Sequence, residues 1–312
     1  MNRTLICLAV VCASCGDPSA TDDAGTDGGG TDAGPVVGPA SVLYDPSSDG
    51  FFDTPFPSDR RTDALGRPIL AGFPRARGLV GQAIDLIEDD LPGFSPVTSV
   101  YFRFTGALDE TSLPGLAAAS MGGSSVVLID VDPASPDRGT RLPAYVRFQA
   151  APTLFWSSNT LSVRPVPGLH MHVGRRYAAV ILEGLRASDG SPVGRNDTFE
   201  ALKTGSDPHY TALFAELEEL GIARADVLNA STFTTSDSTV PMDQARAFIA
   251  AQELPTLTDW AVVSTTPRVT VYSAAFQTYE LMDSTRAYEE FGSGRIRFDA
   301  SGTPAVVNRR AV

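Results

Sequence analysis

A catalytic triad in this sequence would have to use one of three histidines, at positions 170, 172 and 209. A serine hydrolase also needs a serine in the pattern G-x-S-x-G, because small flanking residues let the backbone turn sharply and expose the hydroxyl. The pattern does not occur, and its nearest approach, Gly122 to Val126 (GGSSV), has valine for the second glycine. His209 falls at the second position of a predicted helix, where we expect it to be exposed. We therefore predict no catalytic residue in this chain.

His170 and His172 are the two histidines whose spacing could suit a metal site. Two imidazoles two residues apart on an extended segment lie on one face and could supply half of a metal site. No further ligands are visible nearby, and the pair lies among prolines and glycines that are typical of a loop joining two strands. We interpret both histidines as loop residues, keep them as the candidates for a metal, and expect no cofactor.

Adjacent carboxylates could suggest glycoside hydrolysis, but a catalytic pair must face across several ångströms. Sequence neighbours point in different directions, so they are poor candidates. We predict that Asp109 caps the turn after a strand, where it accepts backbone N–H bonds near Thr111 and Ser112. The same structural interpretation applies to every such doublet, Asp89/Asp90, Asp109/Glu110 and Glu289/Glu290.

The charge balance excludes polyanionic partners. The chain has 24 basic and 37 acidic residues, a net charge of −13, which opposes long-range attraction to nucleic acid. The glycine run at 28–30 is followed by neither a lysine nor a predicted helix, so it does not match a phosphate-binding loop. We expect no nucleic-acid partner and no nucleotide chemistry.

The start of the chain has the features of a targeting signal. All three cysteines lie in the first fifteen residues, and an apolar run, Thr4 to Ala13, has signal-peptide length and is too short to span a bilayer. The run CASC, with small residues before Cys15, resembles a bacterial lipoprotein signal, although Cys12 stands where leucine is usual. The resemblance implies a signal peptide over residues 1–15, a lipid on Cys15 that anchors the chain to the membrane, and a place in the cell envelope, at the outer membrane or cell surface. Plain secretion after cleavage near Ser14 is the alternative.

Residues 16–40 are rich in glycine and aspartate and contain no aromatic or basic residue. We predict a disordered linker here, because nothing can be buried to offset the entropy of ordering. The ordered part begins near Val42 with an irregular N-terminal wrap rich in Pro, Gly, Asp and Phe. Its phenylalanines and a later tryptophan either pack in a core or form a platform for an extracellular ligand, with Phe51, Phe52 and Trp156 as the candidates for ligand contact.

Between residues 95 and 185 the sequence alternates apolar and polar residues in short runs, which is the period of half-buried β-strands. Turns containing Pro and Gly separate the runs, and no predicted helix between them could cross over a parallel sheet. We therefore predict a mainly β fold, a β-sandwich domain over residues 41–205. A short helix is expected at 78–91, and strands are expected at 100–104, 125–132, 144–148, 160–164 and 176–183.

Residues 206–312 show a different pattern, which we interpret as a small α/β connecting segment. Asp207 as N-cap, Pro208 in the first turn and Gly221 at the end predict a helix over 207–221. Further elements are expected at 227–235 (strand), 241–254 (helix), 260–273 (two strands) and 294–307 (hairpin).

Several of these runs resemble a known module. FRFTGALDETSLPG, VVLIDVD and LSVRPVPGLHMHVGRRYAAVILEGLRASDGSPVG resemble the Ig-like domain of bacterial S-layer and other surface proteins. Upstream, TPFPSDRRTDALGRPIL resembles the N-terminal region of bacterial extracellular lipases and esterases of the virulence-factor type, in which an Ig-like module precedes an α/β-hydrolase domain. The similarity spans about residues 42–312. It implies an Ig-like sandwich and a segment over 206–312 that leads toward a hydrolase domain.

These observations together predict a surface-anchored bacterial lipoprotein that is non-catalytic over its 312 residues. We expect an accessory or binding region, resembling the N-terminal half of an extracellular lipase or esterase, whose partner is a hydrolase domain or an unknown extracellular ligand. Two alternatives stay open: a stand-alone adhesin or envelope scaffold, and a carboxylic ester hydrolase whose catalytic half is missing or unrecognised. Strands beyond residue 255 that lack partners would expose their edges to aggregation or proteolysis.

Overall fold

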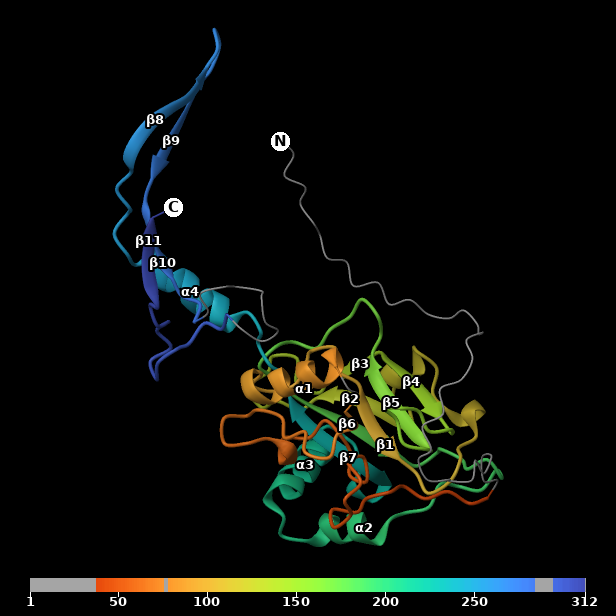
Figure 1. Cartoon of the computed structure of the whole chain (residues 1–312). Coiled ribbons are helices and arrows are strands. Elements are labelled where there is room, and N and C mark those ends of the chain that lie inside the picture. The colour runs from red at the N-terminus through yellow and green to blue at the C-terminus, as the bar shows by residue number, and fades with distance from the viewer. Residues whose placement is uncertain (1–37, 76–77, 284–293, 312) are drawn as a thin grey trace. The chain divides into compact units, whose positions relative to one another are not determined.

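The computed structural model describes residues 38–75, 78–283 and 294–311, all within the second of two compact units, 35–312 (Figure 1). The fold is mainly β and contains several antiparallel sheets. The predicted lipidation site at Cys15 and most of the predicted linker lie outside the described residues.

Two antiparallel sheets form the body of the molecule (Figure 1). The three-stranded sheet has the order β1-β5-β4, with β1 (Val100–Arg103), β5 (Thr160–Pro165) and β4 (Ala144–Gln149). The four-stranded sheet has the order β3-β2-β6-β7, with β3 (Arg141–Leu142), β2 (Val126–Asp130), β6 (Arg176–Leu182) and β7 (Val227–Thr234). Each predicted strand between 100 and 183 is therefore present. The part of the chain between these strands, all of it described, adds the unpredicted two-residue strand β3, and its only helical elements are short 3₁₀ turns, η2 (Glu110–Ser112) and η3 (Ala118–Ser120).

One apolar core lies between the two sheets. Phe102 of β1 and Leu161 of β5 belong to the same buried cluster as Leu128 of β2 and Phe233 of β7. Alternate residues of β1, β5, β2 and β6 supply this core, as the period-two pattern predicts. The four-stranded sheet takes β7 from beyond residue 205, so this layer extends past the boundary that we expected for the sandwich.

Helices cover the outer face of the four-stranded sheet. A second buried cluster joins Val127 and Ile129 of β2 to Phe199 of α2 (Asp197–Thr204) and Phe214 of α3 (Pro208–Glu219). This second layer explains why every residue of β2 is buried, on both faces of the sheet. The sequence predicted α3 but not α2.

The N-terminal wrap, residues 41–62, covers the side of the sheets at β1 and β7. It bridges to β1 at Phe56↔Tyr101, and the Ser231 hydroxyl of β7 donates to the Pro57 carbonyl at 2.6 Å. The wrap ends in a 3₁₀ turn, η1 (Asp59–Arg61). Both β1 and β7 are edge strands, so the wrap satisfies groups that would otherwise be open to solvent.

The remaining elements include the predicted helix α1 (Leu79–Asp90) before the sheets and η4 (Arg224–Asp226) before β7. After the body the chain forms α4 (Val240–Ala250) and two separate two-stranded sheets, β8 (Thr258–Thr265) with β9 (Thr270–Ala275), and β10 (Gln277–Glu280) with β11 (Asn308–Ala311). The segment expected to form a hairpin at 294–307 contains an isolated bridge, Phe298↔Pro304, rather than a regular strand pair. None of the helices in the described ranges is long and apolar enough to cross a membrane.

Candidate functional site

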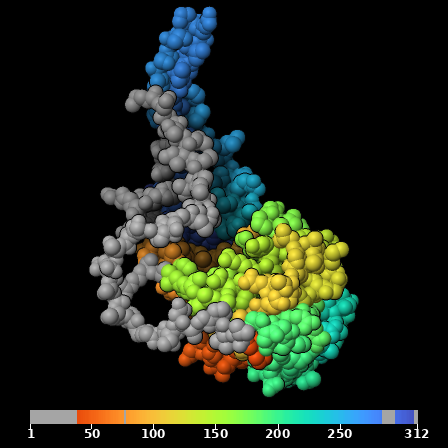
Figure 2. All heavy atoms as spheres, turned by 90° about the vertical axis from the view of Figure 1, so that its right-hand side faces the viewer, coloured from red at the N-terminus to blue at the C-terminus, as the bar shows by residue number. Residues whose placement is uncertain are grey.

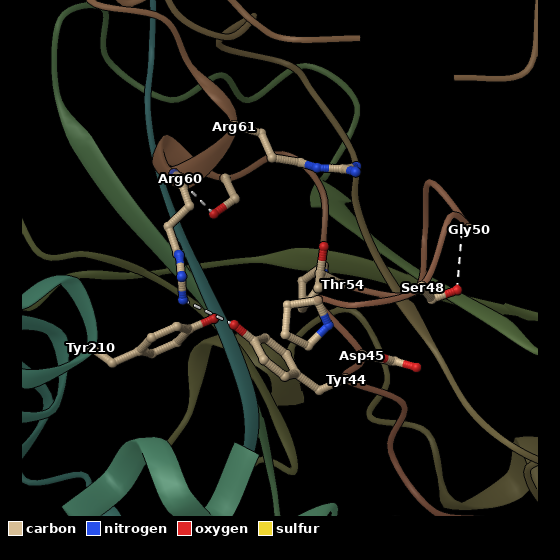
Figure 3. Close-up of a pocket in the computed structure, with 11 residues that line it drawn as sticks. Tyr44, Asp45, Ser48, Gly50, Thr54, Arg60, Arg61 and Tyr210 are labelled. Atoms are coloured by element: carbon tan, nitrogen blue, oxygen red, sulfur yellow. Dashed lines mark hydrogen bonds between the residues drawn. The ribbon is translucent and has the colours of Figure 1, made fainter. Parts of the chain in front are cut away.

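A polar pocket lies where the N-terminal wrap meets the first turn of α3, and it encloses about 190 Å³ (Figure 3). We call it the arginine pocket. The wrap supplies ten of its residues and α3 supplies one. The lining is Tyr44, Asp45, Pro46, Ser48, Gly50, Thr54, Pro55, Ser58, Arg60, Arg61 and Tyr210.

Arg60 is held in this pocket by partners from both segments. Its backbone N–H lies 3.4 Å from the hydroxyl of Ser58, the residue that caps η1. Its guanidinium donates to the Tyr44 hydroxyl at 3.1 Å, pairs with Asp207 at 3.2 Å and lies 5.5 Å from the centre of the Tyr210 ring. The Asp207 carboxylate therefore balances the Arg60 charge.

Arg61 leaves η1 in a different direction from Arg60 (Figure 3). Its Nη1 donates to the Phe51 carbonyl at 2.6 Å, and the guanidinium lies 4.2 Å from the centre of the Phe51 ring. No carboxylate of the described residues forms an ion pair with it, and burial lowers the pKa of Arg61. Within the described ranges, the pocket thus holds one half-buried cation without a counter-ion.

Two acids of the wrap, Asp45 and Asp53, are already bonded within the protein. Asp45 accepts hydrogen bonds from the backbone N–H and the hydroxyl of Ser47 at 2.9 and 2.6 Å, and these bonds lower its pKa. Asp53 accepts from the Ser48 hydroxyl and pairs with Arg103 of β1. Figure 3 shows the Asp45 carboxylate pointing away from the two tyrosines. Burial raises the pKa of Tyr210 well above its usual value, so this phenol keeps its proton.

His209 makes the closest approach to a nucleophile–base pair. Its Nε2 lies 2.8 Å from the Thr232 hydroxyl of β7, which is the reach that such a pair requires. Thr232 is only 2% exposed, so a substrate cannot reach the hydroxyl. Burial, followed by the nearby positive charge of Arg60, lowers the pKa of His209. The expectation that His209 is exposed was wrong, because the imidazole joins α3 to β7.

His170 and His172 lie near each other, with ring centroids 6.3 Å apart. The Nδ1 of His170 is 3.0 Å from the Met171 carbonyl, and the Nε2 of His172 is 3.7 Å from the Asp137 carboxylate. In the ranges that the structure covers, no group of three His, Cys, Asp or Glu side chains could hold a metal ion. Both histidines lie exposed in a loop between β5 and β6.

The two aspartates that the sequence assigns to turns and caps occupy those positions. Asp109 accepts the Thr111 N–H at 2.9 Å at the start of η2, and the bonds from Thr111 lower its pKa. Asp207 accepts the N–H groups of His209 and Tyr210 at 3.1 and 3.3 Å at the start of α3. Asp89 and Asp90 both lie within ion-pair distance of Arg295, and Glu289/Glu290 lie outside the described residues.

The aromatic candidates for ligand contact divide into two groups. Phe51 and Phe52 are 5% and 3% exposed and belong to the core between the sheets, so they offer no surface to a ligand. Trp156 is partly exposed and packs edge-on against Tyr101, with ring centroids 5.2 Å apart.

A second exposed feature is the C-terminal hairpin, residues 258–275, formed by β8 and β9. Every residue of β8 is exposed, and β8 pairs only with β9 among the described strands. Figure 2 draws the atoms of this hairpin in blue. Large apolar side chains lie exposed along it, Trp260, Val262, Val263, Val269, Val271 and Tyr272.

No family model and no curated protein matches this chain. Its function is therefore inferred from the chemistry of these surfaces. Sequence reasoning missed the arginine pocket, since the wrap is irregular and Tyr210 of α3 is distant from it in the chain. The doublet Arg60-Arg61 after the Ser58 cap was the one local signal that could have pointed to it.

Proposed function

We propose that this chain is a non-catalytic, surface-anchored bacterial lipoprotein in which an Ig-like β-sandwich acts as an accessory or binding module. The module is of the kind that precedes the α/β-hydrolase domain of extracellular lipases and esterases. The two antiparallel sheets and their shared core support the sandwich part of this proposal. The resemblance in the sequence supports the Ig-like and lipase-associated parts.

The observation that carries the non-catalytic assignment is the contact between His209 and Thr232. Among the described residues, this is the contact in which an imidazole nitrogen lies within hydrogen-bonding distance of a hydroxyl side chain. The Thr232 hydroxyl is buried where α3 packs on β7. Other carboxylates that could act in catalysis stabilise the fold through hydrogen bonds instead. Asp59 binds the backbone N–H and the hydroxyl of Thr234 at 2.7 and 2.9 Å, and Asp207 caps α3.

The C-terminal hairpin supports an accessory role. Its strands carry exposed apolar side chains, and no other described strand pairs with either of its edges, which is the arrangement that strand addition by a partner requires. A hydrolase domain built on a β-sheet could accept such a hairpin at its edge.

The catalytic part of the proposal is tested with purified protein and short-chain nitrophenyl esters. We expect hydrolysis no faster than that caused by an equal mass of an unrelated protein. Hydrolysis at enzymatic rates that disappears after a single Ser→Ala substitution would overturn the assignment and favour an unrecognised hydrolase.

The anchor is tested separately by labelling with radioactive palmitate in a bacterial host. We expect the full chain to be labelled and recovered with the membrane fraction, and Cys15→Ser to lose both properties. Cys12→Ser is the matched control, because it changes a neighbouring cysteine that the proposal leaves unlipidated. Unchanged labelling of Cys15→Ser would contradict the anchor.

A further inference from the structure

We propose that the arginine pocket binds a small hydroxylated carboxylate, with the chemistry of a hexuronic acid. The site lies between the wrap and α3, so the proposal depends neither on the lipid anchor nor on the C-terminal hairpin. It also does not require the chain to lack catalysis, and it goes beyond the proposed function.

The charge of the ligand follows from the two arginines. Arg60 is balanced by Asp207, whereas Arg61 has no carboxylate partner in the described part of the chain. A half-buried cation without a counter-ion has lost part of its hydration and gains most from an anion that reaches it. One uncompensated cation suits a ligand with one negative charge.

The geometry of Arg61 favours a carboxylate. One edge of its guanidinium is fixed by the Phe51 carbonyl, and its plane is held against the Phe51 ring. A guanidinium is a planar fork that matches the two oxygens of a carboxylate, and here it is oriented before the ligand arrives. Binding therefore loses little side-chain entropy at this residue.

The hydroxyl groups of the ligand follow from the rest of the lining. Hydroxyl side chains both donate and accept hydrogen bonds, so they complement an alcohol better than an inorganic anion, which only accepts. The enclosed volume of about 190 Å³ lies below the range of roughly 300–1,000 Å³ of drug-sized sites. A single sugar ring fits these limits better than an oligosaccharide or an acyl chain. The hydroxyl side chains of the lining that are not buried are Ser48 and Thr54, whereas Tyr44, Ser58 and Tyr210 are 3%, 6% and 2% exposed and form the packed wall of the pocket.

The test is titration of the full chain with sodium glucuronate, followed by calorimetry and by the thermal unfolding midpoint. Glucose supplies the same ring without the charge, and sodium sulfate supplies charge without the ring. We expect saturable glucuronate binding that glucose does not reproduce, and a rise of the unfolding midpoint with ligand concentration.

Arg61→Gln is the diagnostic variant, and Arg246→Gln is its control because Arg246 is an exposed arginine of α4 that does not line the pocket. We expect glucuronate affinity to fall about tenfold or more in Arg61→Gln and to stay unchanged in Arg246→Gln. Arg61→Lys keeps the charge without the fork, so we expect it to bind more weakly than the wild type.

Three results would overturn the proposal. They are absence of glucuronate binding by the wild type at millimolar concentrations, equal binding by Arg61→Gln, and full competition by sulfate at the affinity of glucuronate. Competition by sulfate at that affinity would indicate a site that binds oxyanions without selectivity. Because the first and third comparisons use only the wild-type chain, they decide the matter even if a variant fails to fold. None of these results bears on ester hydrolysis or on lipid labelling at Cys15.

Discussion

Two strands of equal length in this molecule have opposite surroundings. β7 (VLNASTFT) and β8 (TDWAVVST) each contain eight residues and both include β-branched and aromatic side chains. Seven residues of β7 are buried, whereas all eight of β8 are exposed. β7 pairs with β6 and lies between a core, helices and the wrap, while β8 pairs only with β9 within the described ranges. The composition of a strand therefore sets its local conformation, and the layers around it set its burial.

This difference has an energetic consequence. Burial of apolar surface contributes about 25 cal/mol per Å², and a strand packed on both faces receives this contribution twice. An isolated two-stranded hairpin is at best marginally stable in water. We therefore expect the body and the C-terminal hairpin to differ strongly in stability.

Hydrogen exchange should show the largest effect. Amides in the ladder between β6 and β7 should exchange only through near-global unfolding, at about 5–15 kcal/mol, whereas those of β8 and β9 should open with a free energy near zero. Exchange measured by mass spectrometry on the purified chain resolves the two regions within one sample. Protection of β8 equal to that of β7 would contradict the comparison, because it would require a covered hairpin in solution.

Truncation of one apolar side chain in each strand gives the next effect. Phe233 of β7 is fully buried and packs against Phe94 and Tyr177, with ring centroids 6.3 and 6.4 Å away. We expect Phe233→Ala to lower the free energy of unfolding by about 3–5 kcal/mol. Val262 of β8 is 59% exposed, and Val262→Ala should change it by less than about 0.5 kcal/mol. Urea unfolding measures both, and similar losses would show that the hairpin belongs to the cooperative body.

The same contrast explains how much of the fold the sequence could predict. The period-two runs predicted the body strands other than the two-residue β3, and also β8 and β9, because that pattern reports local preference. It could not show that β7 pairs with β6 across the intervening residues 183–226, since pairing depends on long-range contacts. The helix α2 was missed because its apolar stripe is short. Its main anchor is Phe199, which packs against Tyr44 and Tyr210 from distant parts of the chain.

The candidate site was less predictable than the fold. Caps such as Asp207 were predicted because a cap bonds to the next few residues, which the sequence shows directly. The arginine pocket needs Tyr44, Arg60 and Tyr210 to converge from the wrap and α3, and no spacing encodes that. His209 was misjudged for the same reason, because its partner Thr232 lies on another element.

Asp59 allows the end of β7 to be compared with the edges of the C-terminal hairpin. β7 ends under this carboxylate, which accepts the Thr234 N–H, whereas the edges of the C-terminal hairpin have no such cover among the described residues. Asp59→Ala leaves that N–H without its partner and should lower the free energy of unfolding by about 1–3 kcal/mol. Asp59→Asn keeps an acceptor, so it should cost less. Urea unfolding of the two variants checks this order, and equal losses would contradict it.

The pH dependence gives Asp59 a second readout. Burial raises its pKa above the usual 3.8, so the folded state holds the proton more tightly than the unfolded state. This group's contribution to stability is therefore fully present below the ordinary pKa and is lost as pH rises through the raised value. Asp59→Asn cannot ionise, so its unfolding free energy should lack this decrease. Identical pH profiles for wild type and Asp59→Asn would contradict the assignment.

Helix capping should give the smallest effect and compares one helix of the body with one beyond it. Asp207 caps α3 through two backbone N–H groups, whereas the side chain of Thr239 makes no cap bond at the start of α4. We expect Asp207→Ala to lower the free energy of unfolding by about 1 kcal/mol, and Thr239→Ala to change it by less than about 0.5 kcal/mol. Asp207→Asn keeps a capping oxygen but removes the charge that pairs with Arg60, so its loss relative to Asp207→Ala separates the cap from the ion pair. If Thr239→Ala destabilises the chain as much as Asp207→Ala, the two helices contribute equally to one cooperative structure, and the boundary between body and hairpin lies beyond α4.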